Sequence, residues 1–259
     1  MELNPRYSRQ NVYGPVKSRR LGDSLGINLM PTSMKICSFD CVYCECGLND
    51  NRIAQMPKQD TIRLELKKAL ETLKAENEPL DVITFSGNGE PTLHPDFESI
   101  VDFTLALRNQ YFPQAKVSVL SNATVIDKND IFRALKKVDY NILKLDSAIE
   151  ATMRAIDQPT RASFTVKWLL KQLAKFEGNV IIQTMFVRGD YKEQHFDNTT
   201  KEEISAWIKA LRVINPKLVM IYTIDRPAPI ENIEKISLAE LNAIADKVKD
   251  AGFEVIVAG

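Results

Sequence analysis

The stretch Cys37-Ser38-Phe39-Asp40-Cys41-Val42-Tyr43-Cys44 holds three cysteines, with three residues between the first two and two between the last two. Thiolates are the usual ligands of iron-sulfur clusters. A short loop that supplies three thiolates to a cubane cluster leaves its fourth iron without a protein ligand. That iron can bind a substrate or a cofactor, so this spacing predicts a site for chemistry.

Two other uses of these cysteines are weighed against a cluster. A zinc site more often has two paired Cys or Cys/His knuckles, but the four cysteines all lie between Cys37 and Cys46 and the only histidines are His94 and His195. A disulfide is disfavoured because the first six residues do not resemble a signal peptide, and free thiols belong to reducing compartments. We favour a cluster and keep zinc or a purely structural loop as alternatives.

Length and composition agree with a soluble enzyme but do not single one out. The 259 residues are 44% hydrophobic, which is enough for one large core, and no run approaches the roughly 20 apolar residues of a membrane span. We expect one domain, residues 1–259, with an N-terminal arm at 1–23, a core at 24–227 and a C-terminal helix and strand at 228–259. We also expect a cytoplasmic protein. The 34 basic and 34 acidic residues balance, which disfavours a broad nucleic-acid footprint but leaves a local basic patch open.

Short β-branched apolar runs alternate with amphipathic helical patterns, which indicates repeated βα units and a parallel sheet. The predicted strands are residues 25–30, 81–85, 116–120, 140–145, 179–186 and 217–224. The predicted helices are residues 62–75, 97–108, 131–137, 164–176, 201–213 and 238–251, and an apolar run follows at 253–258.

Polar residues follow several of these strands, and in a barrel of parallel strands the chemistry lies at the C-terminal strand ends. After the second strand comes Ser86-Gly87-Asn88-Gly89-Glu90, where two glycines let the backbone approach a ligand and a carboxylate follows. A glycine-rich turn before the next helix is the simpler explanation of this stretch taken alone. Later strands lead to further candidates, each of which also fits a helix cap or a loop: Ser121, Asn122, Asp146, Ser147 and Gln183.

Two further groups are candidates for contact with a substrate. Tyr222, Asp225 and Arg226 lie at the end of the sixth strand, where the last two could equally form a simple surface pair. Arg19 and Arg20 precede the first strand, and arginine suits planar recognition of carboxylate or phosphate. A solvated N-terminal arm is an equal explanation for these two arginines.

The cysteine spacing, with an aromatic residue just before the third cysteine, resembles the radical S-adenosylmethionine (SAM) superfamily. The resemblance implies a partial (β/α)6 TIM-like barrel. It also implies a 4Fe-4S cluster on the catalytic residues Cys37, Cys41 and Cys44. This cluster is expected to cleave SAM reductively to a 5'-deoxyadenosyl radical. In that family the aromatic residue, here Tyr43, packs near the adenine.

The same resemblance assigns SAM-binding roles along the chain. Residues 87–90 are similar to the family's Gly-Gly-Glu motif in a variant form, because Asn88 interrupts Gly87 and Gly89. Glu90 is then expected to bind the methionine amino group. Further SAM contacts are expected from Ser121, Asn122, Asp146, Ser147 and Gln183.

A further resemblance rests on the motifs at residues 14–16, 18–22, 37–44, 86–95 and 222–227. It is to a branch of radical SAM iron-sulfur oxidoreductases related to wyosine-base synthetases. Those synthetases rebuild a guanine base in transfer RNA and carry additional cysteines, whereas this chain has only Cys46 beyond the first three and a net charge of zero. We therefore expect a small-molecule or nucleotide-derived substrate, with transfer RNA less favoured, and a flavodoxin- or ferredoxin-like reductant.

Two alternatives to this function remain. One is a glycyl-radical-enzyme activase, and the other is a non-catalytic iron-sulfur electron-transfer protein or structural zinc module. Cys46 is an inert thiol, an occasional cluster ligand or a hydrogen-atom donor.

Overall fold

The computed structural model describes residues 7–49, 54–226 and 228–259. The chain divides into two compact units. The first lies within Met1–Cys37, Asn49–Ser121 and Val125–Asn141, and the second lies within Ser38–Leu48, Asn122–Thr124 and Ile142–Gly259. The single domain expected from the sequence stays a prediction.

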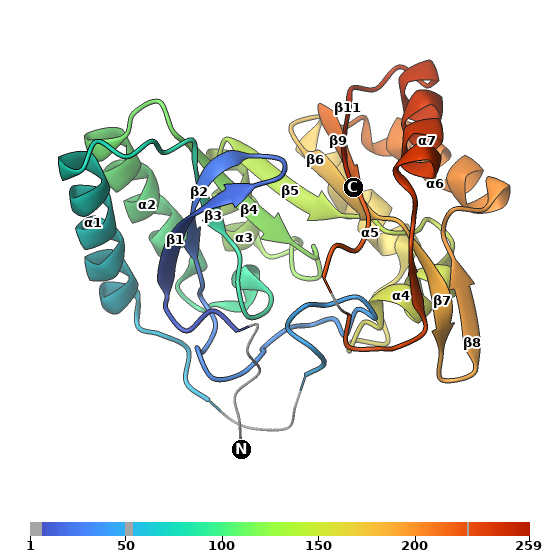
Figure 1. Cartoon of the computed structure of the whole chain (residues 1–259), viewed down its shortest axis with the longest axis horizontal. Helices are drawn as coiled ribbons and strands as arrows, with labels where there is room; N and C mark the ends of the chain where they lie inside the picture. Colours follow the sequence, from blue (N-terminus) through green and yellow to red (C-terminus); the bar gives the residue numbers. More distant parts are fainter. Residues whose placement is uncertain (1–6, 50–53, 227) are drawn as a thin grey trace. The chain divides into compact units, whose positions relative to one another are not determined.

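The first unit is built on four neighbouring strands in the order β1-β2-β3-β4, of which β1 is antiparallel to β2 and the others are parallel. Helices α1 and α2 pack side by side (Figure 1). The elements are β1 (Val12–Ser18), β2 (Gly22–Ile27), α1 (Gln59–Ala75), β3 (Val82–Phe85), the 3-10 turn η1 (Pro91–Leu93), α2 (Phe97–Tyr111), β4 (Lys116–Ser121) and α3 (Asn129–Lys137).

Helix α1 illustrates how this unit forms its core. Its leucine and isoleucine side chains recur every three or four residues, so they share one face, and that face is buried. The buried residues are Ile62, Leu66, Leu70 and Leu73. The amphipathic helix predicted at residues 62–75 is therefore confirmed.

The second unit repeats the βα arrangement with parallel strands in the order β5-β6-β9-β11. A small antiparallel sheet, β10-β7-β8, accompanies it. The elements are β5 (Tyr140–Lys144), α4 (Glu150–Asp157), α5 (Val166–Leu173), η2 (Ala174–Phe176), β6 (Ile181–Met185), β7 (Val187–Tyr191), β8 (Gln194–Asp197), α6 (Lys201–Ile214), β9 (Leu218–Tyr222), β10 (Ile233–Lys235), α7 (Leu238–Asp250) and β11 (Val255–Ala258).

All six predicted strands and all six predicted helices are present, with shifted ends, and the apolar run at 253–258 forms β11. Other elements were not predicted. Residues 12–18 form β1, although the sequence analysis placed them in an N-terminal arm. The strand was missed because an irregularity between Tyr13 and Val16 breaks the alternation by which a strand is recognised. Helix α4 and the small sheet are short or mostly exposed, so they give little periodic signal.

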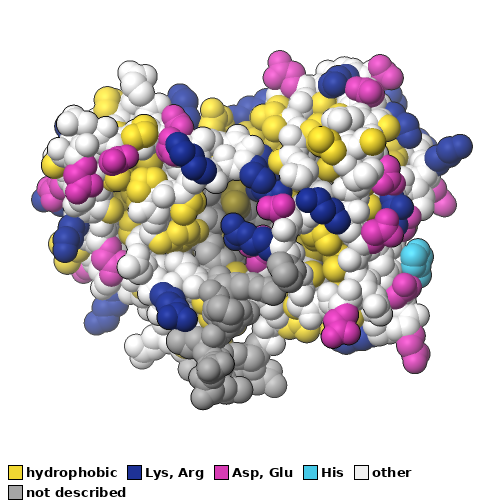
Figure 2. Space-filling view, viewed as in Figure 1, with side chains coloured by type: hydrophobic (Ala, Val, Ile, Leu, Met, Phe, Trp, Pro, Cys, Tyr) yellow, Lys and Arg dark blue, Asp and Glu magenta, His cyan; other side chains and the backbone are white. Residues whose placement is uncertain are grey.

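The surface agrees with the balanced composition. Figure 2 shows Lys and Arg side chains interspersed with Asp and Glu over one face of the molecule. Among the helices that the structure describes, none is long and apolar enough to cross a membrane.

One surface network gives a pH-dependent contribution to stability. Glu98 on α2 accepts hydrogen bonds from Arg133 Nε at 3.0 Å and Nη2 at 2.6 Å, and from Lys137 Nζ at 3.1 Å. The bonds from Arg133, and then those from Lys137, lower the pKa of Glu98 to about 2. Since the ordinary value is 4.5, this contribution is fully present above pH 4.5 and is lost as the pH falls through about 2.

We therefore expect Glu98→Gln to destabilise the protein at pH 7 and to matter less as the solution is acidified. The measurement is urea unfolding of both proteins at several pH values between 7 and 2.5. The difference in unfolding free energy should shrink steadily below pH 4.5. A difference that does not change with pH would contradict the assignment.

Candidate functional site

The cysteine loop, residues 37–48, has little regular structure, so its backbone groups need partners elsewhere. In the second unit, Val42 N donates to Ile156 O at 2.9 Å and Asp40 N donates to Asp157 O at 3.1 Å. The last carbonyls of a helix otherwise lack partners, so the loop completes the end of α4 while α4 holds the loop.

No disulfide joins the four cysteines, all of which lie among the described residues. Cys41 is buried, and Cys37, Cys44 and Cys46 are half-buried. In the described parts of the chain, no three His, Cys, Asp or Glu side chains lie close enough together to hold a metal ion.

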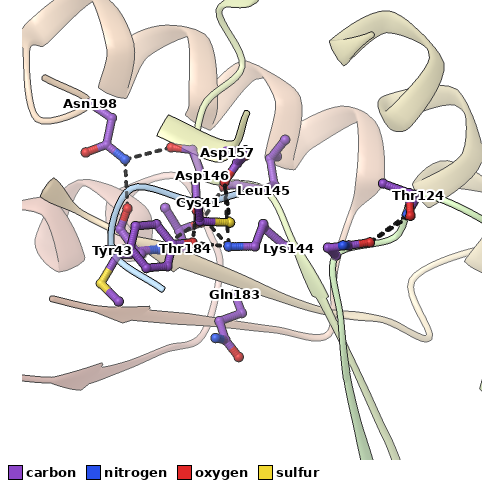
Figure 3. A network of polar contacts seen from close by, with 12 residues as sticks. Cys41, Tyr43, Thr124, Lys144, Leu145, Asp146, Asp157, Gln183, Thr184 and Asn198 are labelled. Carbon is purple, nitrogen blue, oxygen red and sulfur yellow. Dashed lines mark hydrogen bonds and ion pairs between the residues drawn. The ribbon is translucent and has the colours of Figure 1, made fainter. Parts of the chain in front are cut away.

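A polar network in the second unit surrounds Cys41 and Tyr43 (Figure 3). The buried hydroxyl of Tyr43 donates to Asp146 and accepts from Lys144, whose Nζ also lies 4.6 Å from the centre of the Tyr43 ring. Lys144 Nζ is 3.0 Å from Asp146 Oδ2 and 3.6 Å from Asp157 Oδ1. Cys41 Sγ lies 3.6 Å from the same Asp157 oxygen.

The charges in this network depend on one another. Burial disfavours the charged amine, but the surrounding acidic groups, led by Asp146, outweigh it and hold the pKa of Lys144 well above its ordinary value. Burial and the charge of Asp146 raise the pKa of Asp157. Asp146 is fixed further, because its Oδ1 accepts from Met185 N at 2.8 Å.

Neither Lys144 nor Asp157 was among the candidates from the sequence. Lys144 stands two residues before Asp146, so the strand-end position could have identified it. Asp157 ends a helix that the sequence analysis did not predict, and nothing in its neighbourhood along the chain marks it.

In the first unit, the glycine-rich stretch packs against the segment that leads to Cys37. Ile36 N donates to Asn88 O, and Glu90 N donates to Ile36 O, each at 3.0 Å. Gly89 has φ +143°, and a β-carbon on it would lie only 1.8 Å from Ile36 O. The absence of a side chain at this position therefore allows the backbone before the first cysteine to approach.

Asn88, which departs from the family's pattern, holds other backbone segments. Its Nδ2 donates to Ser8 O at 2.9 Å and to Pro31 O at 3.0 Å, and its Oδ1 accepts from Ser8 N at 2.8 Å. These bonds use both amide protons and one lone pair of the amide oxygen. The backbone of Asn88 is engaged too, since its N–H donates to Asn28 Oδ1 at 3.0 Å and its carbonyl accepts from Ile36 N. The cofactor-binding role expected for Asn88 stays a prediction.

Glu90 is buried, and three hydrogen bonds hold its carboxylate in place. Its Oε1 accepts hydrogen bonds from Thr92 N at 3.1 Å, Thr92 Oγ1 at 2.6 Å and Ser121 Oγ at 2.8 Å. Two predicted site residues, Glu90 and Ser121, therefore meet. Hydrogen bonds to a carboxylate favour its charged form.

The remaining strand-end candidates lie in the second unit. Asn122 Nδ2 donates to Ser38 Oγ at 2.9 Å, which links this candidate to the cysteine loop. Gln183 Nε2 donates to Tyr222 Oη at 2.7 Å. Ser147 Oγ donates to Glu203 at 2.7 Å and caps the start of the next segment, a role that needs no ligand.

Of the substrate candidates after β9, Arg226 pairs with Glu45 of the cysteine loop at 2.8 Å. Asp225 lies 3.6 Å from Lys235 Nζ. The two residues therefore do not form the simple pair that was the alternative explanation. Pro227, the next residue, lies outside the described residues.

Arg19 and Arg20 lie in the turn between β1 and β2, where Ser18 Oγ accepts from Arg20 N. This turn is at the N-terminal end of β2, while the cysteine loop and the stretch at 86–90 follow the C-terminal ends of β2 and β3. Six residues of β2, roughly 20 Å of extended chain, separate those two edges. The structure does not bring the two arginines to the other candidates of this unit.

Comparisons with known proteins agree with the family that the cysteine spacing resembles. A family model described as the Radical SAM superfamily matches residues 32–194, well over half of the chain. The chain belongs to the radical SAM superfamily. It is 32% identical, over 92% of its length and 73% of the relative's, to a UPF0026 protein of Methanocaldococcus jannaschii.

Solved structures show the same fold. A radical SAM methyltransferase from Sphaerobacter thermophilus superposes with a TM-score of 0.66 at 12% identity, over 91% of this chain and 65% of that one. TYW1 with a lysine-pyruvate adduct bound gives 0.61 at 14%, over 88% and 73%. The predicted α/β partial barrel of the radical SAM type is confirmed. Across five curated relatives, the chain spans 32% to 77% of the relative's length.

The superfamily's cofactors are a 4Fe-4S cluster and SAM, and the chemistry of the residues present suits both, although the side chains of the described residues are not gathered around a metal position. Three thiols in one loop are the donor set of an open cluster. The amide oxygen of Gln183 is buried and accepts no hydrogen bond from the residues that the structure describes. A hydroxyl or amino group of SAM would satisfy it.

The role of Gly89 can be tested by adding one methyl group. Gly89→Ala should destabilise the protein by more than the about 1–3 kcal/mol of positive-φ strain, since it also clashes with Ile36 O. Gly252→Ala is the matched control, because Gly252 has φ +92° but nothing lies within 4 Å of its β-carbon position. Urea unfolding of both variants gives the comparison, and equal losses would show that the Ile36 contact is unimportant.

Proposed function

We propose that this chain is an enzyme that cleaves SAM and uses the resulting radical to abstract hydrogen from a small-molecule or nucleotide-derived substrate. The observation that carries the proposal is the anchored cysteine loop, in which Cys41 and Tyr43 are buried against a charged network. A loop with a merely structural role has no need for a half-buried lysine beside its thiols.

Each group of residues has a part in this proposal. Cys37, Cys41 and Cys44 would hold the cluster. When bound, the cluster supplies the electron that divides SAM into methionine and the 5'-deoxyadenosyl radical. The protein then has to place the substrate and exclude water.

SAM would be recognised by fixed polar groups. The negative charge of Glu90 suits the methionine ammonium, and its three donors hold it in one place. By resemblance, Tyr43 packs near the adenine, while Ser121, Asn122, Asp146 and Gln183 would bond to the polar parts of SAM. Gly87 and Gly89 would leave the backbone close to the ligand, and Ser147 is the weakest candidate because Glu203 already engages it.

The substrate would be met by Tyr222, at the end of β9, and by Asp225 and Arg226, which follow it. We no longer propose that Arg19 and Arg20 take part, given their place at the opposite edge of β2. The fold likeness to TYW1 and the shared sequence motifs support the branch related to wyosine-base synthetases. The neutral net charge favours a small compound over transfer RNA, and the electron donor would be a flavodoxin- or ferredoxin-like protein.

The first test is SAM cleavage. The protein is reconstituted with iron and sulfide without oxygen, reduced with dithionite and given SAM, and 5'-deoxyadenosine is quantified. The wild type should form it, and Cys41→Ala should not, because the cluster loses a ligand.

Cys46→Ala is the matched control of the same side chain in the same loop. Full cluster content and full product in this variant would identify Cys46 as an inert thiol. A wild type that holds its cluster but neither binds nor cleaves SAM would instead be an electron carrier, and the proposal would fail.

A second test addresses Glu90. In Glu90→Gln the remaining amide oxygen can still accept from Thr92 and Ser121, so the fold should persist while the charge is lost. We expect SAM affinity of the reconstituted protein to fall about tenfold, the effect of one charge-assisted bond of about 1.4 kcal/mol. Equilibrium dialysis measures this, with Glu240→Gln on α7 as control, and unchanged affinity would remove Glu90 from the SAM site.

A further inference from the structure

Lys144 is a half-buried cation that has no part in the proposed function. It ends β5, and only 16% of its side chain is exposed. A buried ammonium is costly unless charged or polar partners compensate for the lost water. Its partners therefore indicate its role.

Those partners all belong to, or touch, the cysteine loop. Nζ lies over the ring of Tyr43 at 4.6 Å and bonds to the Tyr43 hydroxyl. On its other sides are Asp146 at 3.0 Å and Asp157 at 3.6 Å. Asp157 Oδ1 in turn lies 3.6 Å from Cys41 Sγ, so one carboxylate oxygen separates the lysine from a cluster ligand (Figure 3).

The charge at this place matters for an iron-sulfur centre. Reduction potentials of such clusters depend on the net charge, hydrogen bonding and solvent exposure around them. Negative charge near Cys41 makes it harder to add an electron to a cluster there, and the positive charge of a nearby ammonium makes it easier. Lys144 stays charged at neutral pH, because its acidic neighbours raise its pKa.

We propose that Lys144 is a positioning residue that fixes Tyr43 and the Cys41 side of the loop, and that its positive charge raises the reduction potential of the cluster. The proposal rests on the proposed function, since it concerns the cluster of that same site. It predicts how readily a weak biological donor can reduce this protein.

The experiment compares Lys144→Met, which removes the charge at similar length, with Lys144→Arg, which keeps it. Lys249→Met is the control, because Lys249 is an exposed α7 residue paired only to Asp246 among the contacts described. Each protein is reconstituted, its iron content is measured, and the potential is obtained by redox titration monitored by electron paramagnetic resonance.

We expect Lys144→Met to make the one-electron reduction at least about tenfold less favourable, a shift of roughly 59 mV to more negative potential. Lys144→Arg and Lys249→Met should stay near the wild type. A Lys144→Met protein with full iron content and the wild-type potential would overturn the proposal.

A second variant keeps the test decisive if Lys144→Met does not assemble a cluster. Asp146→Asn removes the carboxylate that lies 3.0 Å from Lys144 Nζ and leaves Lys144 in place, so the potential should shift in the opposite direction. A potential that is unchanged or more negative in Asp146→Asn would contradict the electrostatic argument.

The positioning role of Lys144 can also be measured in protein that holds no cluster. In the apo-protein, alkylation of Cys41 by iodoacetamide, followed by mass spectrometry, should be faster in Lys144→Met than in the wild type or Lys249→Met. Equal rates would refute the positioning role. If the wild type holds no cluster, the proposed function fails, and the labelling result alone then decides whether Lys144 fixes the loop.

Discussion

A loop without regular structure can be buried only if its backbone and charged groups find partners, and this constraint governs the arrangement around the cysteines. The N–H groups of Asp40 and Val42 bond to the last carbonyls of α4. That bonding brings the side chain of Asp157 to Cys41, and a carboxylate buried there calls for a compensating cation, which Lys144 supplies. The local electrostatics thus follow from the way in which the loop is held.

The glycine-rich stretch shows that one sequence feature can satisfy two requirements. Gly89 lets the backbone of Ile36 approach, while the next residue, Glu90, carries a carboxylate whose orientation is set by Thr92 and Ser121. Between the glycines, Asn88 ties together segments from elsewhere in the first unit. The departure from a Gly-Gly-Glu pattern therefore has a structural reason and leaves the carboxylate in place.

Helices and strands were predicted best from the sequence where their pattern of apolar residues repeats. Buried β-branched strands and amphipathic helices such as α1 were predicted because burial on one face imposes a period on the sequence. Strand β1 and helix α4 were missed because a bulge interrupts the first and the second is only eight residues long. Arg19 and Arg20 were candidates by residue type, but a hairpin turn decides at which end of β2 they lie.

The sequence by itself determined the class of the protein, because three thiolates at fixed spacing within one loop define a donor set that needs no distant residue. It also determined the succession of βα units. Only the tertiary structure decided which charges surround Cys41, since Lys144 and Asp157 are more than a hundred residues away along the chain. Electrostatic interactions depend on distance in space, and no local pattern encodes that distance.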